Sequence, residues 1–415
     1  MSGHDHDDLL PREVAVERVL AIRAEALSSQ PTEGVPLDRI GGRTTAEAIV
    51  AETDLPPHDF ATMDGFAFDA TAGYPYDLTE IDVYPEDEPP SIGAGQAVRI
   101  ATGAPLPSGA NAVLKREEAT VEDGQLRGAA VEPGTYVYGK ASNVAAGETL
   151  VEENERLGPK DAILLGDVGV EEVPVHARFD CAVLATGTEI HEGRSKDLDS
   201  AMLAGLVRAW GHEATYEGSV PDDYEVVESR ITELADAYDV VLTTGGTSVG
   251  KKDYVIRALA ALGEVDFHRA AVRPGKPIAA ARLPDHDAVA FAIPGKPVGA
   301  HAITTLVARP FFTGDASLPT IDATLARDVG IGPAGFDYAV PVILDGDAEG
   351  LGSGDRPEAM PLGHVDSPLQ VYDETYDPSV LSSSTRATRA DGFFITREER
   401  SAGETVRVVP YPVVE

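Results

Sequence analysis

Between residues 178 and 308, short apolar runs alternate with polar loops and with segments whose apolar residues recur at helical spacing. The apolar runs predict strands at residues 181–185, 215–220, 240–243 and 288–293. The periodic segments predict helices at residues 200–210, 222–237, 253–262 and 298–308. Strand, loop and helix in alternation are typical of a mainly parallel, doubly wound sheet. Ligands of such sheets bind at the carboxyl ends of the strands, so we expect the loops that follow these strands to meet at one edge.

The pattern is different on both sides of this α/β segment. Residues 11–28 are predicted to form an amphipathic helix, and a second helix is predicted near residues 43–51. Residues 53–140 are rich in proline, glycine and short alternating runs, which indicates a small β-rich domain, and strand-like pieces continue through residues 148–176. Beyond residue 320 a second small β-domain is predicted, with strands at residues 339–344, 392–396 and 406–409.

Composition limits the classes of partner and compartment. A length of 415 residues predicts two to four domains, and 70 acidic against 33 basic residues give a net charge of −37. Such a surface repels nucleic acid and anionic membranes, and because the acidity is spread along the whole chain we interpret it as adaptation to a high-salt cytoplasm. Cys181 is the only cysteine, so no intrachain disulfide can form and a reducing, cytoplasmic location fits. The sequence begins without a signal-peptide pattern and has no apolar stretch long enough to span a membrane.

Three glycine-rich loops within the α/β segment carry cations. Lysine occurs at only eight positions in the chain, and four of them are in these loops: Lys251, Lys252, Lys276 and Lys296. Glycine lets the backbone approach a ligand closely and point successive N–H groups at it, while lysine and arginine add charge. This combination suits phosphates and other oxyanions. The alternative is that these cations only pair with the acidic surface.

Seven short motifs follow one another along nearly the whole chain. They are Met-Asp-Gly-Phe-Ala at 63–67, Thr-Gly-Ala-Pro-Leu-Pro-Ser-Gly-Ala-Asn-Ala-Val at 102–113, Thr-Gly-Thr-Glu at 186–189, Pro-Asp-Asp at 221–223, the Thr-Gly-Gly loop at 243–254, Arg-Pro-Gly-Lys-Pro at 273–277 and Ile-Pro-Gly-Lys-Pro-Val at 293–298. In this order they resemble the motifs of the molybdopterin molybdenumtransferases, the MoeA and gephyrin E-domain family. Each motif alone is weak, whereas seven in register make the resemblance specific.

The resemblance implies a multidomain α/β fold, in which a central doubly wound, MogA-like α/β domain is flanked by β-rich domains and an elongated N-terminal helical or linker domain. The expected domains are an elongated linker domain I (residues 1–44 with 140–176), a β-rich domain II (45–139), an α/β molybdopterin-binding domain III (177–316) and a small C-terminal β-domain IV (317–415).

The resemblance also implies a reaction. Members of the family insert molybdate into adenylylated molybdopterin with release of AMP, assisted by a divalent cation, here expected to be Mg²⁺. The family is a homodimer in which domain II completes the cleft of the other subunit, so Asp64 is expected to act in trans. A molybdopterin adenylyltransferase is an expected partner, and the sequence leaves open whether molybdate or tungstate is the physiological substrate.

Carried over residue by residue, the family motifs imply specific roles. Catalytic roles are expected for Asp64, Thr102, Glu189, Asp222, Asp253 and Lys276. Mg²⁺ prefers carboxylates together with substrate phosphate and water, and the expected ligands are Asp64, Glu189, Asp222 and Asp253. The expected substrate-binding residues are Thr244, Gly245, Gly246, Ser248, Gly250, Arg273, Gly275, Pro294, Gly295 and Lys296. Several of these side chains also suit turns and helix caps, so a purely local role is the alternative for each.

The chain departs from the family pattern at several positions. The replaced motif residues are Thr188, Ala201, Ser142, Asn143, Lys296 and Gly299, and residues 335–338 lack the arginine often found nearby. In one hypothesis Lys296 supplies the cation that the last domain lacks. In another, the chain is a catalytically weakened paralogue that serves as a dimeric molybdopterin- or molybdate-binding or scaffold protein. A third hypothesis is a molybdopterin adenylyltransferase, whose fold resembles residues 178–315 but which lacks the flanking domains.

Overall fold

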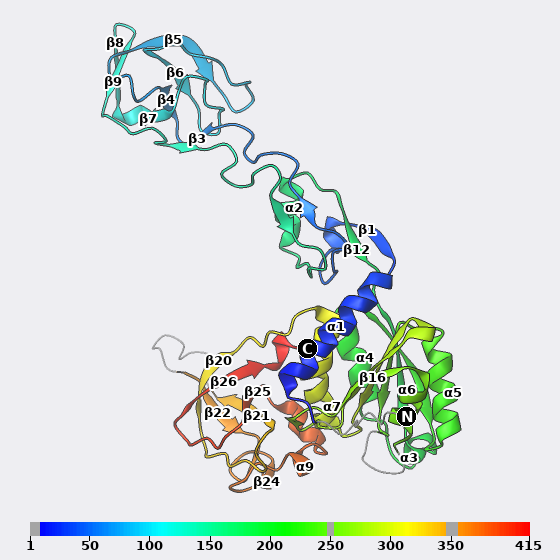
Figure 1. The fold of residues 1–415 in the computed structure, drawn as a ribbon. Coiled ribbons are helices and arrows are strands. Elements are labelled where there is room, and N and C mark those ends of the chain that lie inside the picture. The colour runs from blue at the N-terminus through cyan, green and yellow to red at the C-terminus, as the bar shows by residue number, and fades with distance from the viewer. Residues whose placement is uncertain (1–8, 247–252, 346–355) are drawn as a thin grey trace. The chain divides into compact units, whose positions relative to one another are not determined.

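A computed structural model describes residues 9–246, 253–345 and 356–415 of the chain. The chain divides into two compact units, which are drawn together in Figure 1. The first unit comprises Met1–Glu33, Gly41–Thr44 and Val175–Glu415, and the second comprises Gly34–Ile40 and Thr45–Pro174. No helix of the described segments is long and apolar enough to cross a membrane.

The core of the first unit is a mixed six-stranded sheet in the order β14-β13-β15-β19-β18-β16. Its strands are β13 (Asp180–Thr186), β14 (Glu213–Val220), β15 (Val240–Thr244), β16 (Glu264–His268), β18 (Ala279–Leu283) and β19 (Ala288–Ile293). The first four strands in the spatial order are parallel, as the alternating pattern predicted. Strand β18 runs antiparallel to both of its neighbours, β19 and β16. Neither β16 nor β18 was predicted, because each is only five residues long and carries charged residues.

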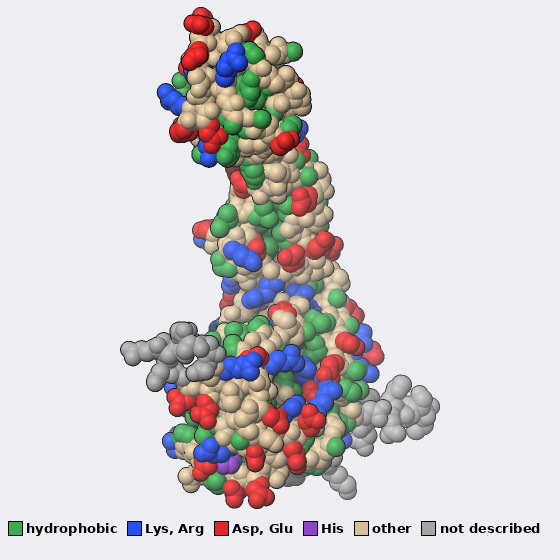
Figure 2. All heavy atoms as spheres, turned by 90° about the vertical axis from the view of Figure 1, so that its left-hand side faces the viewer, with side chains coloured by type: hydrophobic (Ala, Val, Ile, Leu, Met, Phe, Trp, Pro, Cys, Tyr) green, Lys and Arg blue, Asp and Glu red, His purple; other side chains and the backbone are tan. Residues whose placement is uncertain are grey.

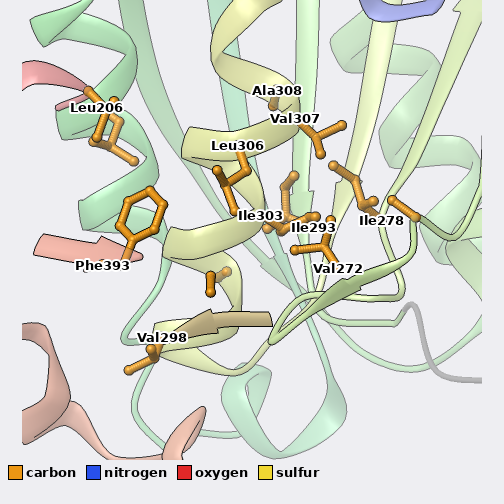
Figure 3. Close-up of a cluster of buried hydrophobic side chains, with 14 of the residues drawn as sticks. Leu206, Val272, Ile278, Ile293, Val298, Ile303, Leu306, Val307, Ala308 and Phe393 are labelled. Carbon is orange, nitrogen blue, oxygen red and sulfur yellow. The ribbon is translucent and has the colours of Figure 1, made fainter. Parts of the chain in front are cut away.

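Helices cover both faces of this sheet, which confirms the doubly wound arrangement (Figure 1). They are α4 (Ser200–Ala209), α5 (Tyr224–Ala235), α6 (Tyr254–Leu262), α7 (Pro297–Ile303) and α8 (Arg309–Thr313), with a π-helical turn at Thr304–Ala308. Alternate strand residues face opposite ways: Ala182 and Leu184 pack with α5 and α6, whereas Val183 packs with α4, α7 and α8. Figure 3 shows the second of these faces, where Ile303 and Val307 lie close to Ile293 of β19 and to Ile278.

The N-terminal helix α1 (Arg12–Ser29) forms as predicted, and its apolar face packs on the α/β core. Val19, Ile22 and Leu27 are buried in the same hydrophobic cluster as the residues of α8. The structure therefore does not confirm a separate N-terminal helical domain, and the domain boundaries expected from the family remain predictions.

The predicted helix near residues 43–51 is wrong. These residues are extended or in turns, and the only regular element there is the short strand β2 (Ile49–Val50). The amides of Thr45 and Ala46 donate to the carbonyls of Glu155 and Pro174, so tertiary hydrogen bonds override the helical propensity of the alanine- and glutamate-rich sequence.

The second unit contains the predicted β-rich domain, a six-stranded sheet in the order β7-β4-β6-β5-β9-β8. Its strands are β4 (Gly65–Phe68), β5 (Tyr76–Val83), β6 (Gln96–Ile100), β7 (Ala112–Lys115), β8 (Ala119–Glu122) and β9 (Gln125–Gly128). Two small hydrophobic clusters pack against this sheet. The remaining elements of this part of the chain are β1 (Thr32–Pro36), β3 (Phe60–Ala61), β10 (Val137–Tyr138), β11 (Thr149–Val151), β12 (Glu172–His176) and α2 (Asp161–Asp167), a helix that was not predicted.

The C-terminal part of the first unit is a small β-domain, as predicted. Its strands are β17 (Val272–Arg273), β20 (Ile321–Leu325), β21 (Asp337–Asp345), β22 (Glu358–Pro361), β25 (Gly392–Thr396) and β26 (Thr405–Pro410), with a minor pair β23 (Gly363–His364) and β24 (Gln370–Tyr372) and a short helix α9 (Pro378–Leu381). The strands β21, β22, β20, β26 and β25 close into a barrel because β21 pairs with both β22 and β25. Strand β17 joins the barrel through β21, so the loop after residue 273 lies where the α/β core and the barrel meet.

Candidate active site

Three of the marked loops leave the parallel sheet at the same edge. Ala185 of β13 is paired with Thr244 of β15, and Thr244 is paired with Ile293 of β19, so these strands end at the same level. The amide of Gly245 donates to the carbonyl of Ile293 at 3.0 Å and joins two of the loops. This arrangement confirms the expectation that the loops meet at the carboxyl edge of the sheet.

Two glycines are required by this arrangement. Gly245 has φ of +89°, and a Cβ atom there would lie 2.5 Å from the carbonyl oxygen of Thr186. Gly275 has φ of +113°, and its Cβ atom would lie 2.5 Å from Cβ of Ile303. No side chain fits at either position, so both loops approach their neighbours by backbone alone.

A cavity of about 480 Å³ lies between these loops, the 273–277 loop and the C-terminal domain. It is lined by Gly245, Gly246, Arg273, Pro274, Gly275, Lys276, Pro277, Pro294, Gly295, Lys296, Gly299, Pro378, Ser379 and Ser382. Most of the residues expected to bind substrate are therefore brought together. Thr244 directly precedes the lining residues, and Ser248 and Gly250 lie outside the described residues.

The charge of this cavity has one sign. Among the described residues that line it, Arg273, Lys276 and Lys296 are cations and there is no carboxylate. The guanidinium of Arg273 lies 4.3 Å from the ring centroid of Phe336, and Nζ of Lys276 lies 5.8 Å from the same centroid. The ring holds both cations beside the cavity by cation–π attraction while leaving their hydrogen-bond donors for another partner. Such a cluster of cations in a chain of net charge −37 has the chemistry that suits an oxyanion.

The C-terminal domain supplies one wall of the cavity. Nζ of Lys296 donates to the carbonyl of Ser379 at 3.1 Å, and the amide of Val298 donates to the carbonyl of Ser382 at 3.0 Å. The side chain of Ser382 lies where a side chain at Gly299 would point, since a Cβ atom on Gly299 would be 3.6 Å from Cβ of Ser382. Neither Ser379 nor Phe336 was predicted to be a site residue; in the sequence, Ser379 is marked only by the run of three serines that follows it at 382–384.

Asp199 is a further residue that was not predicted to belong to the site. Its side chain is buried at the start of α4, and its Oδ2 accepts a hydrogen bond of 3.1 Å from the hydroxyl of Thr244. Among the described residues, its other oxygen has no hydrogen-bond partner. Burial raises the pKa of Asp199 to about 6, and the negative charge of Asp197 adds to the shift. Asp199 therefore places a titratable carboxyl directly behind the Gly245 turn.

Glu189 and Asp222 lie at the ends of the neighbouring strands β13 and β14. The amide of Thr188 donates to Oδ2 of Asp222 at 3.2 Å, and the Thr188 hydroxyl accepts from the amide of Asp222 at 2.9 Å. Thr188, which replaces an acidic or amide residue of the family motif, thus fixes Asp222 beside the short helix α3 (Thr188–His191) that carries Glu189. Both expected metal ligands therefore lie on the loops that follow these two neighbouring strands.

Asp253 is the N-cap of α6. Its carboxylate accepts from the amide of Ile256, and its Oδ2 lies 3.9 Å from Nε2 of His268. Burial raises its pKa to about 6, while the amide of Ile256 acts in the opposite direction. Asp253 does not line the cavity of about 480 Å³.

Asp64 and Thr102 are in contact with each other and belong to the second unit. Both the amide and the hydroxyl of Thr102 donate to Oδ1 of Asp64 at 2.7 Å. These two hydrogen bonds, the amide first, hold the pKa of Asp64 below its usual range. Asp64 lines a shallow pocket of about 380 Å³ with Arg99 and Arg116.

The four expected Mg²⁺ ligands, Asp64, Glu189, Asp222 and Asp253, remain predictions, and Asp64 lies in the other compact unit from the remaining three. Within the described parts of the chain, no group of three or more histidine, cysteine, aspartate or glutamate side chains is arranged to hold a metal. Asp222 is hydrogen-bonded to Thr188, the residue next to Glu189.

Two family models match most of the chain. The model of the MoeA N-terminal region (domain I and II) matches residues 12–169. The model described as a probable molybdopterin binding domain matches residues 182–314, which contain the parallel sheet and the cationic loops.

Similar proteins cover between about two thirds and nearly all of the chain. The molybdopterin molybdenumtransferase of Synechococcus elongatus is 30% identical over 324 residues, which are 73% of this chain and 79% of that protein. The enzyme of the same name from Haemophilus influenzae is 29% identical over 293 residues, 65% of this chain and 69% of that protein. A solved structure of a molybdopterin biosynthesis MoeA protein from Pyrococcus horikoshii, 29% identical, has a TM-score of 0.68 and covers 97% of this chain and 99% of its own. The chain therefore belongs to the molybdopterin molybdenumtransferase family, whose members act in molybdenum cofactor biosynthesis.

Proposed function

We propose that the chain inserts molybdate, or tungstate, into adenylylated molybdopterin and releases AMP. The observation that carries the proposal is the cavity at the carboxyl edge of the sheet, where Arg273, Lys276 and Lys296 line the wall without a described carboxylate. Molybdate is a tetrahedral dianion, and such anions bind fixed cations, N–H groups and hydroxyls. Lys276 and Arg273 are the proposed anion-binding residues, and the Gly245–Gly246 turn is proposed to bind the phosphate of the pterin substrate through its amides.

The chemistry of the donor set is compatible with Mg²⁺. Mg²⁺ is usually bound by one or two carboxylates together with substrate phosphate and water, and Glu189 and Asp222, on the loops after two neighbouring strands, are the proposed carboxylates. When bound, Mg²⁺ would offset negative charge on the departing AMP. The roles of Asp64 and Asp253 as further ligands are part of the same proposal, and each would depend on substrate or on a second subunit to complete the site.

The protein is proposed to act as a cytoplasmic homodimer in which Asp64 of one subunit completes the cleft of the other. The two hydrogen bonds from Thr102 support this role, because they fix the Asp64 carboxylate in its ionised form. A molybdopterin adenylyltransferase is the proposed supplier of the adenylylated substrate. The spread of acidic residues supports function in a high-salt cytoplasm.

Two of the departures from the family pattern have partners in the structure that support retained activity. Lys296 adds a cation to the cavity and contacts Ser379 of the C-terminal domain. Ser382 lies beside Gly299, since a Cβ atom on Gly299 would be 3.6 Å from Cβ of Ser382. The competing proposal is a weakened paralogue that binds the pterin or molybdate without insertion, for which the absence of a carboxylate at Ser142 and Asn143 is the main support.

The experiment that tests the proposal is AMP release from adenylylated molybdopterin on addition of molybdate, in high KCl with Mg²⁺. Molybdate-dependent release would support the transferase. Tight binding of the adenylylated pterin without release would contradict insertion and favour the binding or scaffold function.

A further inference from the structure

A second cavity, of about 410 Å³, lies between the start of α1 and the barrel strands β25 and β26. It has no part in the proposed reaction. Four arginines line it: Arg12, Arg397, Arg400 and Arg407. Figure 2 shows Lys and Arg side chains gathered on the barrel side of the first unit, which faces the viewer. Such a concentration is unusual in a chain with 33 basic and 70 acidic residues.

A buried carboxylate fixes two of these arginines. Asp337 is only 3% exposed, and its Oδ2 accepts from Nε of Arg12 at 2.8 Å while its Oδ1 accepts from Nε of Arg397. Both contacts use the Nε atom of the guanidinium. The terminal nitrogens are left for other acceptors, of which the half-exposed Glu13 is one. Asp337 therefore holds two guanidiniums in place without using all their donors.

Arg407 has an unpaired guanidinium among the described residues. It lies on the exposed side of β26, and within the described segments it has no hydrogen-bond or ion-pair partner. Asp322, which faces it across β20 and β26, is paired instead with Arg356 at 3.5 Å. The cavity lining thus has one more arginine than it has carboxylates, which are Glu13, Asp337 and Glu398.

Part of the lining is apolar: Leu318, Ile395 and Val409. A bare inorganic anion would leave these side chains uncovered, whereas a molecule with an anionic group and a non-polar body would contact them as well as the arginines. Pockets of this volume are in the range that holds small organic molecules. A phosphate monoester fits better than a carboxylate, because its three terminal oxygens accept from several guanidiniums at once.

We infer that this cavity is a second ligand site, which binds a small organic phosphate through Arg407 and the terminal nitrogens of Arg12 and Arg397. Its ligand contacts the barrel and the first turn of α1 and does not share residues with the cationic cavity at the sheet edge.

Calorimetric titration of the full-length chain with phenyl phosphate tests the inference. Because the cavity at the sheet edge also suits a tetrahedral anion, the titration is made in a Lys276→Ala background, which weakens that site. We expect one saturable site per chain in this background. Arg407→Gln should lower its affinity by at least about tenfold, which is the effect of removing one charge-assisted hydrogen bond. Inorganic phosphate should bind more weakly than phenyl phosphate, because it does not contact the apolar side.

Arg127→Gln is the matched control, since Arg127 is an exposed arginine of β9 in the second unit and its loss changes the net charge equally. It should leave the affinity unchanged, and circular dichroism should show that both variants are folded. Absence of a saturable site in the Lys276→Ala protein, or equal affinity of the Arg407→Gln and Arg127→Gln proteins, would overturn the inference. Neither result bears on molybdate-dependent AMP release.

Discussion

The hydroxyl of Thr244 donates a 3.1 Å hydrogen bond to Oδ2 of Asp199, and Asp199 is buried behind the glycine turn that Thr244 begins. Helix α4 and strand β15, which are far apart in sequence, are joined at this point. The contact fixes the last residue of a strand whose next two residues line the cationic cavity.

Asp199→Asn should stabilise the protein at neutral pH. The folded state raises the pKa of Asp199 from 3.8 to about 6, so the folded state holds its proton more tightly than the unfolded state. Protonated Asp199 therefore contributes to the free energy of unfolding. This contribution is fully present below about pH 4 and is lost as the pH rises through 6. An asparagine carries no charge and still accepts from Thr244, so the gain at pH 7.5 should be on the order of 2 kcal/mol and should shrink towards pH 4.

The measurement is urea unfolding of both proteins across this pH range at constant KCl. Asp197→Asn is a control, because it removes a neighbouring, only partly buried carboxylate while keeping an oxygen that accepts from the amides of Asp199 and Ser200, and it should give a smaller pH-dependent change. A stability difference between wild type and Asp199→Asn that does not depend on pH would contradict the account.

Gly275→Ala should destabilise the first unit by on the order of 2–3 kcal/mol, because a Cβ atom with φ of +113° would overlap the side chain of Ile303. Gly403→Ala separates the cost of the positive φ angle from the cost of the steric overlap. Gly403 has φ of +84° but no atom within 4 Å of its Cβ position, so only backbone strain of about 1 kcal/mol is expected there. Thermal unfolding of both variants checks the prediction, which fails if the two variants lose the same stability.

Lys296→Asn should raise the molybdate concentration for half-maximal AMP release by about tenfold, because the cavity loses one of its three described cations. Lys296→Arg keeps the charge and should have a smaller effect. Lys160→Asn, a change of equal charge at an exposed position just before α2, should have none. An unchanged half-saturating molybdate concentration in Lys296→Asn would show that Lys296 serves only to contact Ser379.

A heterodimer experiment tests whether Asp64 acts in trans. One subunit carries Asp64→Ala and the other Lys276→Ala, and the heterodimer is purified through two different affinity tags. If each cleft combines Asp64 of one subunit with Lys276 of the other, one cleft carries both substitutions and the other carries none. The heterodimer should then have about half the wild-type activity per dimer, since a twofold assembly has two clefts. If both residues serve the same subunit, each cleft is damaged and the heterodimer should be as inactive as the two homodimers.

Sequence patterns predicted the α/β core well because its central strands β13, β15 and β19 are buried on both faces and the helices α5 and α6 begin at capping aspartates. The strand that ends at Thr244 and the helix capped by Asp253 illustrate this, since both are marked by local residues. The antiparallel strand β18 was not predicted, and the segment near Thr45 was wrongly predicted to be a helix. Distant backbone partners determine the conformation of both.

The candidate site was predicted to a similar extent. The glycine and proline loops that carry Arg273, Lys276 and Lys296 were identified, because their backbone requirements are local. The contributions of Phe336 and Ser379 were not identified, since they arise only from the packing of the barrel on the α/β core. The burial of Asp199 is likewise a tertiary property that no local pattern marks.

The central claim is tested most directly by AMP release from adenylylated molybdopterin in the presence and absence of molybdate, with wild type and Lys276→Ala compared in high KCl and Mg²⁺. A parallel series with tungstate establishes which oxyanion is preferred. The account predicts oxyanion-dependent release by the wild type and a loss of about 10²–10³-fold in rate for Lys276→Ala, because a fixed cation beside the anion is removed. No release by a wild type that binds the adenylylated pterin tightly, or equal rates for both proteins, would contradict it.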